Sequence, residues 1–200
     1  MPLDFTAIDF ETANSSNASA CAVGLVRVRD GIVVEQTGWL IQPPPGHDEF
    51  FELNTRIHGI CADDVVDAAT WTSQLSAIVD FVGDDVIVAH NAGFDMAVLK
   101  RACAATDDEV PAYRYVCSLQ VARKVYQLDS YRLPFVAAEA GFAEFAHHNA
   151  IADALACAHV MIDAARRQSA ESIELLAEAT AVKVSQITVA AAPAKTAFAA

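Results

Sequence analysis

The sequence predicts an α/β fold: a mixed five-stranded sheet with helices on both faces. Three observations support this prediction. Strand-like segments come first and in succession, the rest of the chain alternates between helical and strand-like patterns, and hydrophobic residues make up 54% of the 200 residues. A strand-rich start followed by alternation is typical of helices packed on a mixed sheet, and a chain of this size and hydrophobicity can bury a sizeable core.

Three strands are expected at the N-terminal end. Residues 4–10 (DFTAIDF) alternate and are rich in strand formers, and residues 20–29 (ACAVGLVRVR) have a second strand pattern. Asp30-Gly31 is a strong hairpin-turn signal, so residues 32–42 are predicted to be the third strand. The three prolines and glycine at 43–46 then end that strand as a loop.

The rest of the chain alternates between helices and strands. Apolar residues recur at helical spacing from Trp71 to Val82, and Gly83 is a usual C-terminal stop. Residues 86–89 (VIVA) are wholly apolar, which is typical of a central strand buried on both faces. The remaining predicted elements are a strand at 113–117 and helices at 94–105, 118–126, 133–140 and 151–167.

The predicted domain covers residues 1–167 and is followed by an alanine-rich segment, 168–200. Within that segment residues 171–182 indicate a helix, and the last dozen residues are typical of a frayed tail or a linker. No apolar run approaches the roughly 20 residues that cross a bilayer, so no membrane association is expected. The five cysteines are scattered, which favours reduced thiols and a cytoplasmic location.

The net charge of −13 limits the kinds of partner that the chain can bind. Proteins that coat duplex nucleic acid are usually basic, so this charge argues against an extended nucleic-acid groove. It is compatible with an enzyme that holds a few nucleotides at one end, because bound metal ions can supply positive charge locally.

Two acids lie close together on the first predicted strand. Asp9 and Glu11 are two residues apart, so they project from one face of the strand, while Ile8 and Phe10 project from the other. A solvated sheet face is the structural alternative. The flanking sequence is strongly apolar, however, and unpaired acids on a central strand are costly unless a cation compensates them.

Two further acids and a histidine come from later segments. Asp95 follows the strand at 86–89, at the carboxyl edge of the sheet, where open α/β proteins place their sites. Capping or dipole stabilisation of the next helix is an equally good reason for an aspartate there. Asp153 lies inside an otherwise apolar helix and needs a partner. His148 lies five residues before it, near the helix start, and can bend over the same site.

Four carboxylates and one histidine are a set suited to phosphodiester hydrolysis. Oxygen-rich sites favour Mg²⁺ or Mn²⁺ over zinc. Two such ions can clamp the attacking and leaving oxygens of a phosphodiester displacement. A histidine near its usual pKa can deprotonate the attacking water at neutral pH.

Three ordered motifs carry a resemblance to a known family. The sequences DFET at 9–12, HNAGFD at 90–95 and HNAIAD at 148–153 resemble the motifs of the DEDDh 3′→5′ exonucleases. The resemblance is to the proofreading (epsilon) subunit of bacterial DNA polymerase III and its stand-alone relatives in particular, over roughly residues 4–165. Secondary motifs agree with it, namely IHGI at 57–60, CSL at 117–119 and YRL at 131–133. The resemblance implies an RNase H-like fold and a mechanism with two metal ions.

The resemblance also implies roles for the acids and the histidine. Asp9 would bridge two Mg²⁺ or Mn²⁺ ions, Glu11 and Asp153 would complete one ion site, and Asp95 would support the other. His148, rather than His147, has the family's spacing to the last acid and so resembles the general base.

The resemblance implies a substrate site as well, lined by Thr12, His58, Asn91 and Phe94. An aromatic ring there can stack on the terminal base without recognising its identity, and simple core packing is the alternative for Phe94. A set of cations near the same edge could contact phosphates, although such side chains are more often solvated: Lys100, Arg101, Arg123, Lys124 and Arg132.

The expected activity is release of nucleoside monophosphates from single-stranded or frayed DNA 3′ ends. Short RNA or an RNA 3′ end is the alternative substrate, because pocket details decide whether a 2′-hydroxyl is accepted. A non-catalytic scaffold that keeps the fold for protein binding is disfavoured by the complete set of acids. A zinc hydrolase is disfavoured because the sequence has no HExxH spacing.

A polymerase or other repair protein is an expected partner besides the nucleic-acid end. The sequence departs from the polymerase subunit in three places. NSSNAS at 14–19 replaces the short turn after the first motif, and Cys117-Ser118 stands where many relatives have an acid or cysteine before threonine. The tail carries no recognisable polymerase-binding segment. A free-standing nuclease, or the exonuclease module of a longer parent, is therefore expected.

Overall fold

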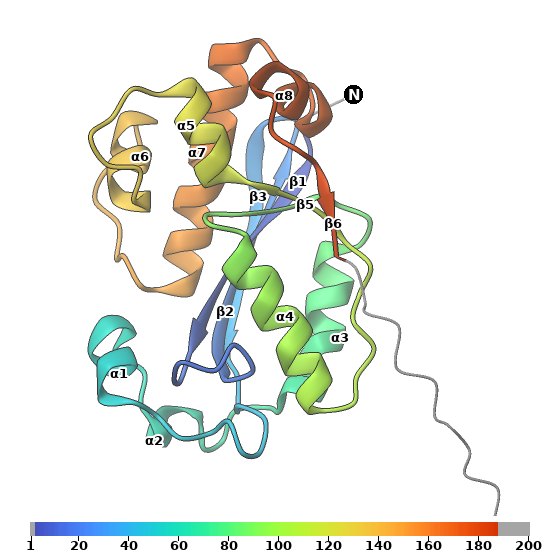
Figure 1. Cartoon of the computed structure of the whole chain (residues 1–200), viewed down its shortest axis with the longest axis vertical. Coiled ribbons are helices and arrows are strands. Elements are labelled where there is room, and N and C mark those ends of the chain that lie inside the picture. The colour runs from blue at the N-terminus through green and yellow to red at the C-terminus, as the bar shows by residue number, and fades with distance from the viewer. Residues whose placement is uncertain (1–2, 188–200) are drawn as a thin grey trace, which may run out of the picture.

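A single mixed sheet runs through the molecule in the computed structural model, which describes residues 3–187 (Figure 1). The strand order is β3-β2-β1-β4-β5-β6, and helices pack on both faces. The predicted α/β architecture is therefore confirmed. A sixth strand, β6 (Ser185–Gln186), adds to the five expected ones by pairing antiparallel with β5; two residues are too short to give a sequence signal.

The three N-terminal strands form an antiparallel meander. They are β1 (Phe5–Thr12), β2 (Ala20–Arg29) and β3 (Ile32–Leu40). Asp30 and Gly31 both have positive φ, at 51° and 71°, as the predicted two-residue hairpin turn requires. The register of this meander pairs Asp9 with Gly24, and Gly24 with Gly38.

The centre of the sheet is the short apolar strand predicted at 86–89. It is observed as β4 (Ile87–Ala89), fully buried, with parallel neighbours β1 and β5 (Arg114–Cys117) on its two sides. Since parallel strands end at the same edge of a sheet, the segments that follow β1, β4 and β5 come together there.

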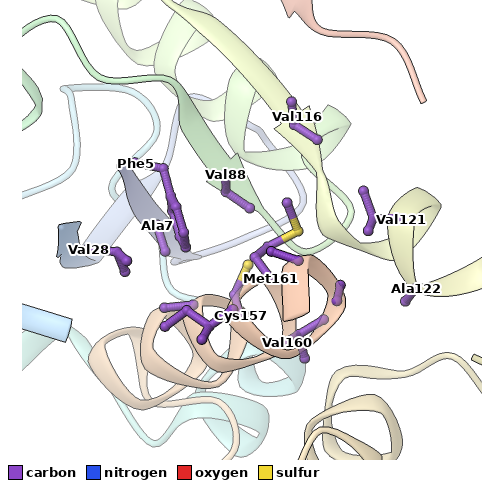
Figure 2. Packing of buried hydrophobic residues seen from close by; sticks show 14 of the residues in the cluster. Phe5, Ala7, Val28, Val88, Val116, Val121, Ala122, Cys157, Val160 and Met161 are labelled. Atoms are coloured by element: carbon purple, nitrogen blue, oxygen red, sulfur yellow. The ribbon is translucent and has the colours of Figure 1, made fainter. Parts of the chain in front are cut away.

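Each face of the sheet has its own hydrophobic core. Figure 2 shows part of the larger one, which includes Phe5 and Ala7 of β1 together with Cys157, Val160 and Met161. The helices of this face are α5 (Ser118–Val125), α6 (Leu133–Glu139), α7 (Ala150–Gln168) and α8 (Ile173–Thr180). The opposite face is covered by α3 (Trp71–Val82) and α4 (Gly93–Ala105).

Two short helices precede α3 that the sequence patterns do not predict. They are α1 (Glu52–His58), which buries none of its residues, and α2 (Ala62–Val65). Helices of one or two turns with little or no buried face have no detectable apolar period. None of the helices within residues 3–187 is long and apolar enough to cross a membrane.

The helix predicted at 171–182 is observed as α8, and it packs on the same core as α7. Ile173 and Leu176 are buried in that core, and Ile187 lies in the core of the other face. The division of the chain at residue 167 remains a prediction. The expected tail or linker, the last dozen residues, lies outside the described residues.

Candidate active site

Asp9 and Glu11 project from the face of β1 that carries α7. Ala7, two residues before Asp9, belongs to the core under α7, whereas Ile8 and Phe10 belong to the core of the other face. Both acids are half-buried, and both alternate with fully buried neighbours. The predicted two-residue periodicity therefore places the two carboxylates together.

Asp153 reaches the same place from the first turn of α7. It is buried, and its carboxylate lies close to those of Asp9 and Glu11: one oxygen from each of the three residues lies within 4.8 Å of the others. The Asn149 side chain begins the helix by accepting a hydrogen bond from Ala152 N at 3.1 Å. An acid in a first turn also interacts favourably with the positive end of the helix dipole.

Asp95 lies beside this trio, in the first turn of α4. It is 1% exposed, and its Oδ1 accepts a hydrogen bond of 3.1 Å from the backbone N–H of Phe10, the residue between Asp9 and Glu11. This bond ties the acid after β4 to the strand that carries the first two acids. The four predicted acids thus converge from three segments of the chain.

Burial and repulsion between carboxylates disfavour the charged forms of three of the four acids, Asp9, Glu11 and Asp95. Burial, followed by repulsion from Asp95, Asp153 and Glu11, raises the pKa of Asp9 well above its ordinary value. Burial and the same kind of repulsion raise the pKa of Glu11 to about 8. The pKa of Asp95 is raised to about 8, chiefly by burial and against the hydrogen bond from Phe10. A divalent cation would relieve this repulsion, and carboxylate oxygens are the donors that hard cations prefer.

Two adjacent histidines border Asp153. His147 Nδ1 lies 2.9 Å from Asp153 Oδ1, and the backbone N–H of His148 donates to Asp153 Oδ2 at 3.0 Å. The two imidazoles are stacked, with centroids 3.7 Å apart, and His148 has a φ of 67°. Burial and the neighbouring His147 lower the pKa of His148. The ring therefore stays neutral to a lower pH than an ordinary histidine, as a proton acceptor requires.

A third histidine, His90, lies beside the acids and makes hydrogen bonds to other segments of the chain. It is not among the predicted site residues. Its Nε2 lies 3.0 Å from the carbonyl oxygen of Tyr131, which can only accept, so Nε2 carries the proton. Its Nδ1 then accepts from the Ser118 hydroxyl at 2.9 Å, and that oxygen accepts from the Cys157 thiol at 3.3 Å. Burial lowers the pKa of His90. Its place at the start of the HNAGFD motif is the sequence signal that could have identified it.

Three of the acids, Asp9, Glu11 and Asp153, line a cavity of about 720 Å³. Asn91 and Phe94 line it, and Phe94 is 37% exposed, so core packing does not account for this side chain. Of the five predicted cations, Arg123 and Arg132 line the cavity. The other walls come from His90, Leu119, residues 129–133 and the two histidines before α7.

Thr12 and His58 lie beside this cavity rather than in its walls. Asn54 Nδ2 donates to the Thr12 carbonyl at 3.0 Å, and His58 Nε2 donates to the same oxygen at 3.1 Å. The backbone N–H of Ile60 donates to His58 Nδ1 at 3.0 Å. His58 borders a smaller cavity of about 230 Å³, which His148 also lines. The structure thus gives Thr12 a part in orienting His58.

A family model described as exonuclease (RNase_T) matches residues 6–161, which include all four acids and His148. The chain belongs to this exonuclease family. Two curated relatives are a DNA polymerase III PolC-type protein of Thermotoga petrophila, 29% identical over 79% of the chain, and the putative bifunctional exonuclease/endonuclease protein MT2247 of Mycobacterium tuberculosis, 30% identical over 87% of it. The chain spans only 12% and 28% of the lengths of these two relatives.

Solved structures confirm the fold of this exonuclease domain. Exonuclease X in complex with 5′ overhanging duplex DNA has a TM-score of 0.70 at 24% identity and covers 88% of this chain and 99% of its own. The nuclease domain of 3′hExo, a DEDDh family member bound to rAMP, has a TM-score of 0.72 at 13% identity, over 92% and 97% of the two chains. The predicted fold is thereby confirmed, and the exonuclease resemblance seen in the motifs is confirmed by the family model.

Proposed function

We propose that this domain is a metal-dependent 3′→5′ exonuclease that releases nucleoside monophosphates from single-stranded or frayed DNA 3′ ends. The observation that carries the proposal is the convergence of Asp9, Glu11 and Asp153 within 4.8 Å of one another, with Asp95 beside them. Asp9, Glu11 and Asp153 line a cavity of about 720 Å³, and the raised pKa values of Asp9, Glu11 and Asp95 favour a cation as their partner.

The acids would bind the metal ions, and His148 has a separate role in proton transfer. Asp9 would hold both of two Mg²⁺ or Mn²⁺ ions, Glu11 and Asp153 one of them, and Asp95 the other. When bound, these ions supply positive charge next to the attacking and leaving oxygens of the phosphodiester. His148, held neutral by its surroundings, accepts the proton of the attacking water.

The remaining walls of the cavity bind the nucleic-acid end. The exposed ring of Phe94 stacks on the terminal base, and Asn91 contributes an amide beside it. Arg123 and Arg132 provide positive charge for a phosphate in a chain that is acidic as a whole. His58 donates a hydrogen bond to the Thr12 carbonyl, which holds its ring in place. His58 and His148 line the same smaller cavity, so His58 contacts the terminal nucleotide next to His148.

DNA is the proposed substrate because the PolC-type relative is named a DNA polymerase and Exonuclease X is bound to DNA. RNA is the second candidate, since the nuclease domain of 3′hExo is bound to rAMP. Association with a polymerase or other repair protein is proposed on the name of the PolC-type relative. The cytoplasm is the proposed location, because the five cysteines are free thiols.

Oligonucleotides labelled at the 5′ end test this function. With Mn²⁺ present, we expect a descending ladder, which reports 3′→5′ polarity, and a faster ladder for single-stranded DNA than for RNA of the same sequence. Asp9→Ala and Asp153→Ala are each expected to remove nearly all activity while the far-UV circular dichroism stays that of the parent. Immediate release of the labelled 5′ nucleotide without a ladder, or near-parental rates in a folded Asp9→Ala variant, would refute the proposal. A faster RNA ladder would favour the second substrate.

A further inference from the structure

Two glycines extend across the sheet from Asp9 in a single row. Gly24 of β2 is the direct partner of Asp9, and Gly38 of β3 is the direct partner of Gly24. Directly paired residues project from the same face of a sheet, so these positions share the face of Asp9 and of α7. Glycine weakens the interior of a strand and often marks a place where another backbone approaches closely.

The approaching backbone at Gly24 is the first turn of α7. A Cβ atom at Gly24 would lie 2.1 Å from the carbonyl oxygen of Ala150 and 2.4 Å from the nitrogen of Ile151. Both are main-chain atoms and cannot rotate away. Any side chain at position 24 therefore requires the start of α7 to move off the sheet.

The contact at Gly38 is of a different kind. A Cβ atom there would lie 2.3 Å from Ile151 Cγ1 and 2.8 Å from Ile151 Cδ1, and 2.6 Å from the carbonyl oxygen of Val23. Two of these three contacts are with one side chain of α7, which can be shortened by mutation.

We propose that Gly24 and Gly38 are positioning residues that set the distance of Asp153 and His148 from the acids of β1. Asp153 follows Ile151 by two residues within the first turn of α7, and His148 lies two residues before Ala150, so both are joined directly to the backbone that rests on the two glycines. The inference rests on the proposed function for its consequence in catalysis. Its consequence for metal binding is independent of the substrate.

The two kinds of contact allow a crossed experiment with five variants: Gly24→Ala, Gly38→Ala, Ile151→Ala and the two double variants that combine a glycine change with Ile151→Ala. The affinity for Mn²⁺ is measured by calorimetry, and kcat and KM are measured on a single-stranded oligonucleotide. We expect each glycine variant to bind Mn²⁺ about 10- to 100-fold more weakly, as for changes in the outer-shell groups that orient metal ligands, and to lose kcat more than it raises KM.

The double variants separate positioning from a general loss of stability. Ile151→Ala is expected to restore part of the Mn²⁺ affinity to Gly38→Ala, because it removes two of the three close contacts, and none to Gly24→Ala, whose contacts are main-chain atoms. Leu176→Ala, a fully buried change in α8, serves as the control. It should lower the melting temperature and leave the Mn²⁺ affinity unchanged.

Two results would overturn the inference: a folded Gly24→Ala variant with the parent's Mn²⁺ affinity, or equal rescue of both glycine variants by Ile151→Ala. If Gly24→Ala does not fold, Gly38→Ala and its double variant decide the matter, and lack of rescue there counts against the inference. A parent that binds Mn²⁺ but degrades no nucleic acid would refute the proposed function, while the Mn²⁺ affinities would still decide the role of the glycines.

Discussion

At the scale of single residues, the site consists of four carboxylates that come from three segments of the chain and lie close together. Asp9 and Glu11 are adjacent in space because a strand repeats every two residues. Asp153 joins them only because α7 lies on that face, and Asp95 only because it accepts the Phe10 N–H. Asp9, Glu11 and Asp95 lie where their charged forms are disfavoured, so the site favours a bound positive charge.

The two histidines before α7 are expected to differ in their effect on catalysis. His148→Gln should lower kcat by about 10²- to 10⁴-fold, the usual contribution of a general base. His147→Gln should have a much smaller effect, because a glutamine amide can replace its hydrogen bond to Asp153. Single-turnover rates of both variants at saturating Mn²⁺ check this. A larger loss in His147→Gln would assign the proton transfer to His147.

The raised pKa of Glu11 predicts how stability depends on pH when metal is removed. The folded chain keeps the Glu11 proton up to about pH 8, whereas the unfolded chain releases it near the ordinary value of about 4.3. The unfolded state thus binds fewer protons in this window, so this group's contribution to stability is lost as pH rises from about 4 to 8.

Glu11→Gln has no such titration and provides the comparison. In EDTA, the melting temperature of Glu11→Gln minus that of the parent should rise steadily between pH 5 and pH 8. Taking the difference removes the effects of the histidines, which titrate in both proteins. A difference that is constant or falls with pH would show that the pKa of Glu11 is not raised in the metal-free chain.

At the scale of the elements, α7 is the element that assembles the site. It lies across β1, β2 and β3 and carries Asp153 in its first turn. Its apolar stripe predicted a helix but not which strands it would cover. Its approach is set by the glycine row beside Asp9, and its N-terminal end by Asn149.

Substitutions in the neighbouring helix α8 test how far along the chain the folded domain extends. Leu176 is fully buried, whereas the adjacent Leu175 is 47% exposed. Leu176→Ala should lower the free energy of unfolding by about 2–5 kcal/mol, and Leu175→Ala by no more than about 0.5 kcal/mol, as is usual for surface positions. Urea unfolding curves measure both.

This comparison also tests the boundary predicted at residue 167. If residues 168–187 fold separately from the exonuclease domain, Leu176→Ala will leave the main unfolding transition at the parent midpoint. A single transition shifted to lower urea would make α8 part of the same cooperative unit.

At the scale of the whole molecule, a net charge of −13 is combined with a site made of four acids. Metal binding is therefore expected to stabilise the folded chain. A ligand that binds only the native state contributes about 2.7 kcal/mol at 100 times its dissociation constant. We expect millimolar Mn²⁺ or Mg²⁺ to raise the melting temperature relative to EDTA, and Asp9→Ala to lose most of this shift. An unchanged melting temperature in the parent would contradict an ion at these acids.

The sequence by itself determined the features that depend on near neighbours in the chain. These are the hairpin at Asp30-Gly31, the buried strand at 86–89, the longer helices and the same-face placement of Asp9 and Glu11. Each follows from turn chemistry or from a period of two or 3.6 residues, which a short stretch of sequence displays completely. The ordered motifs extended this to the full set of acids and to His148.

Only the tertiary structure decided the contacts between distant segments. It placed His90 against Tyr131 and Ser118, gave Thr12 a carbonyl contact with His58, and added β6 to the sheet. It also showed that Gly24 and Gly38 have no room for a side chain under α7. The physical reason is that close packing between elements is fixed by the shapes of both partners, and the pattern of either segment alone contains only its own half of that contact.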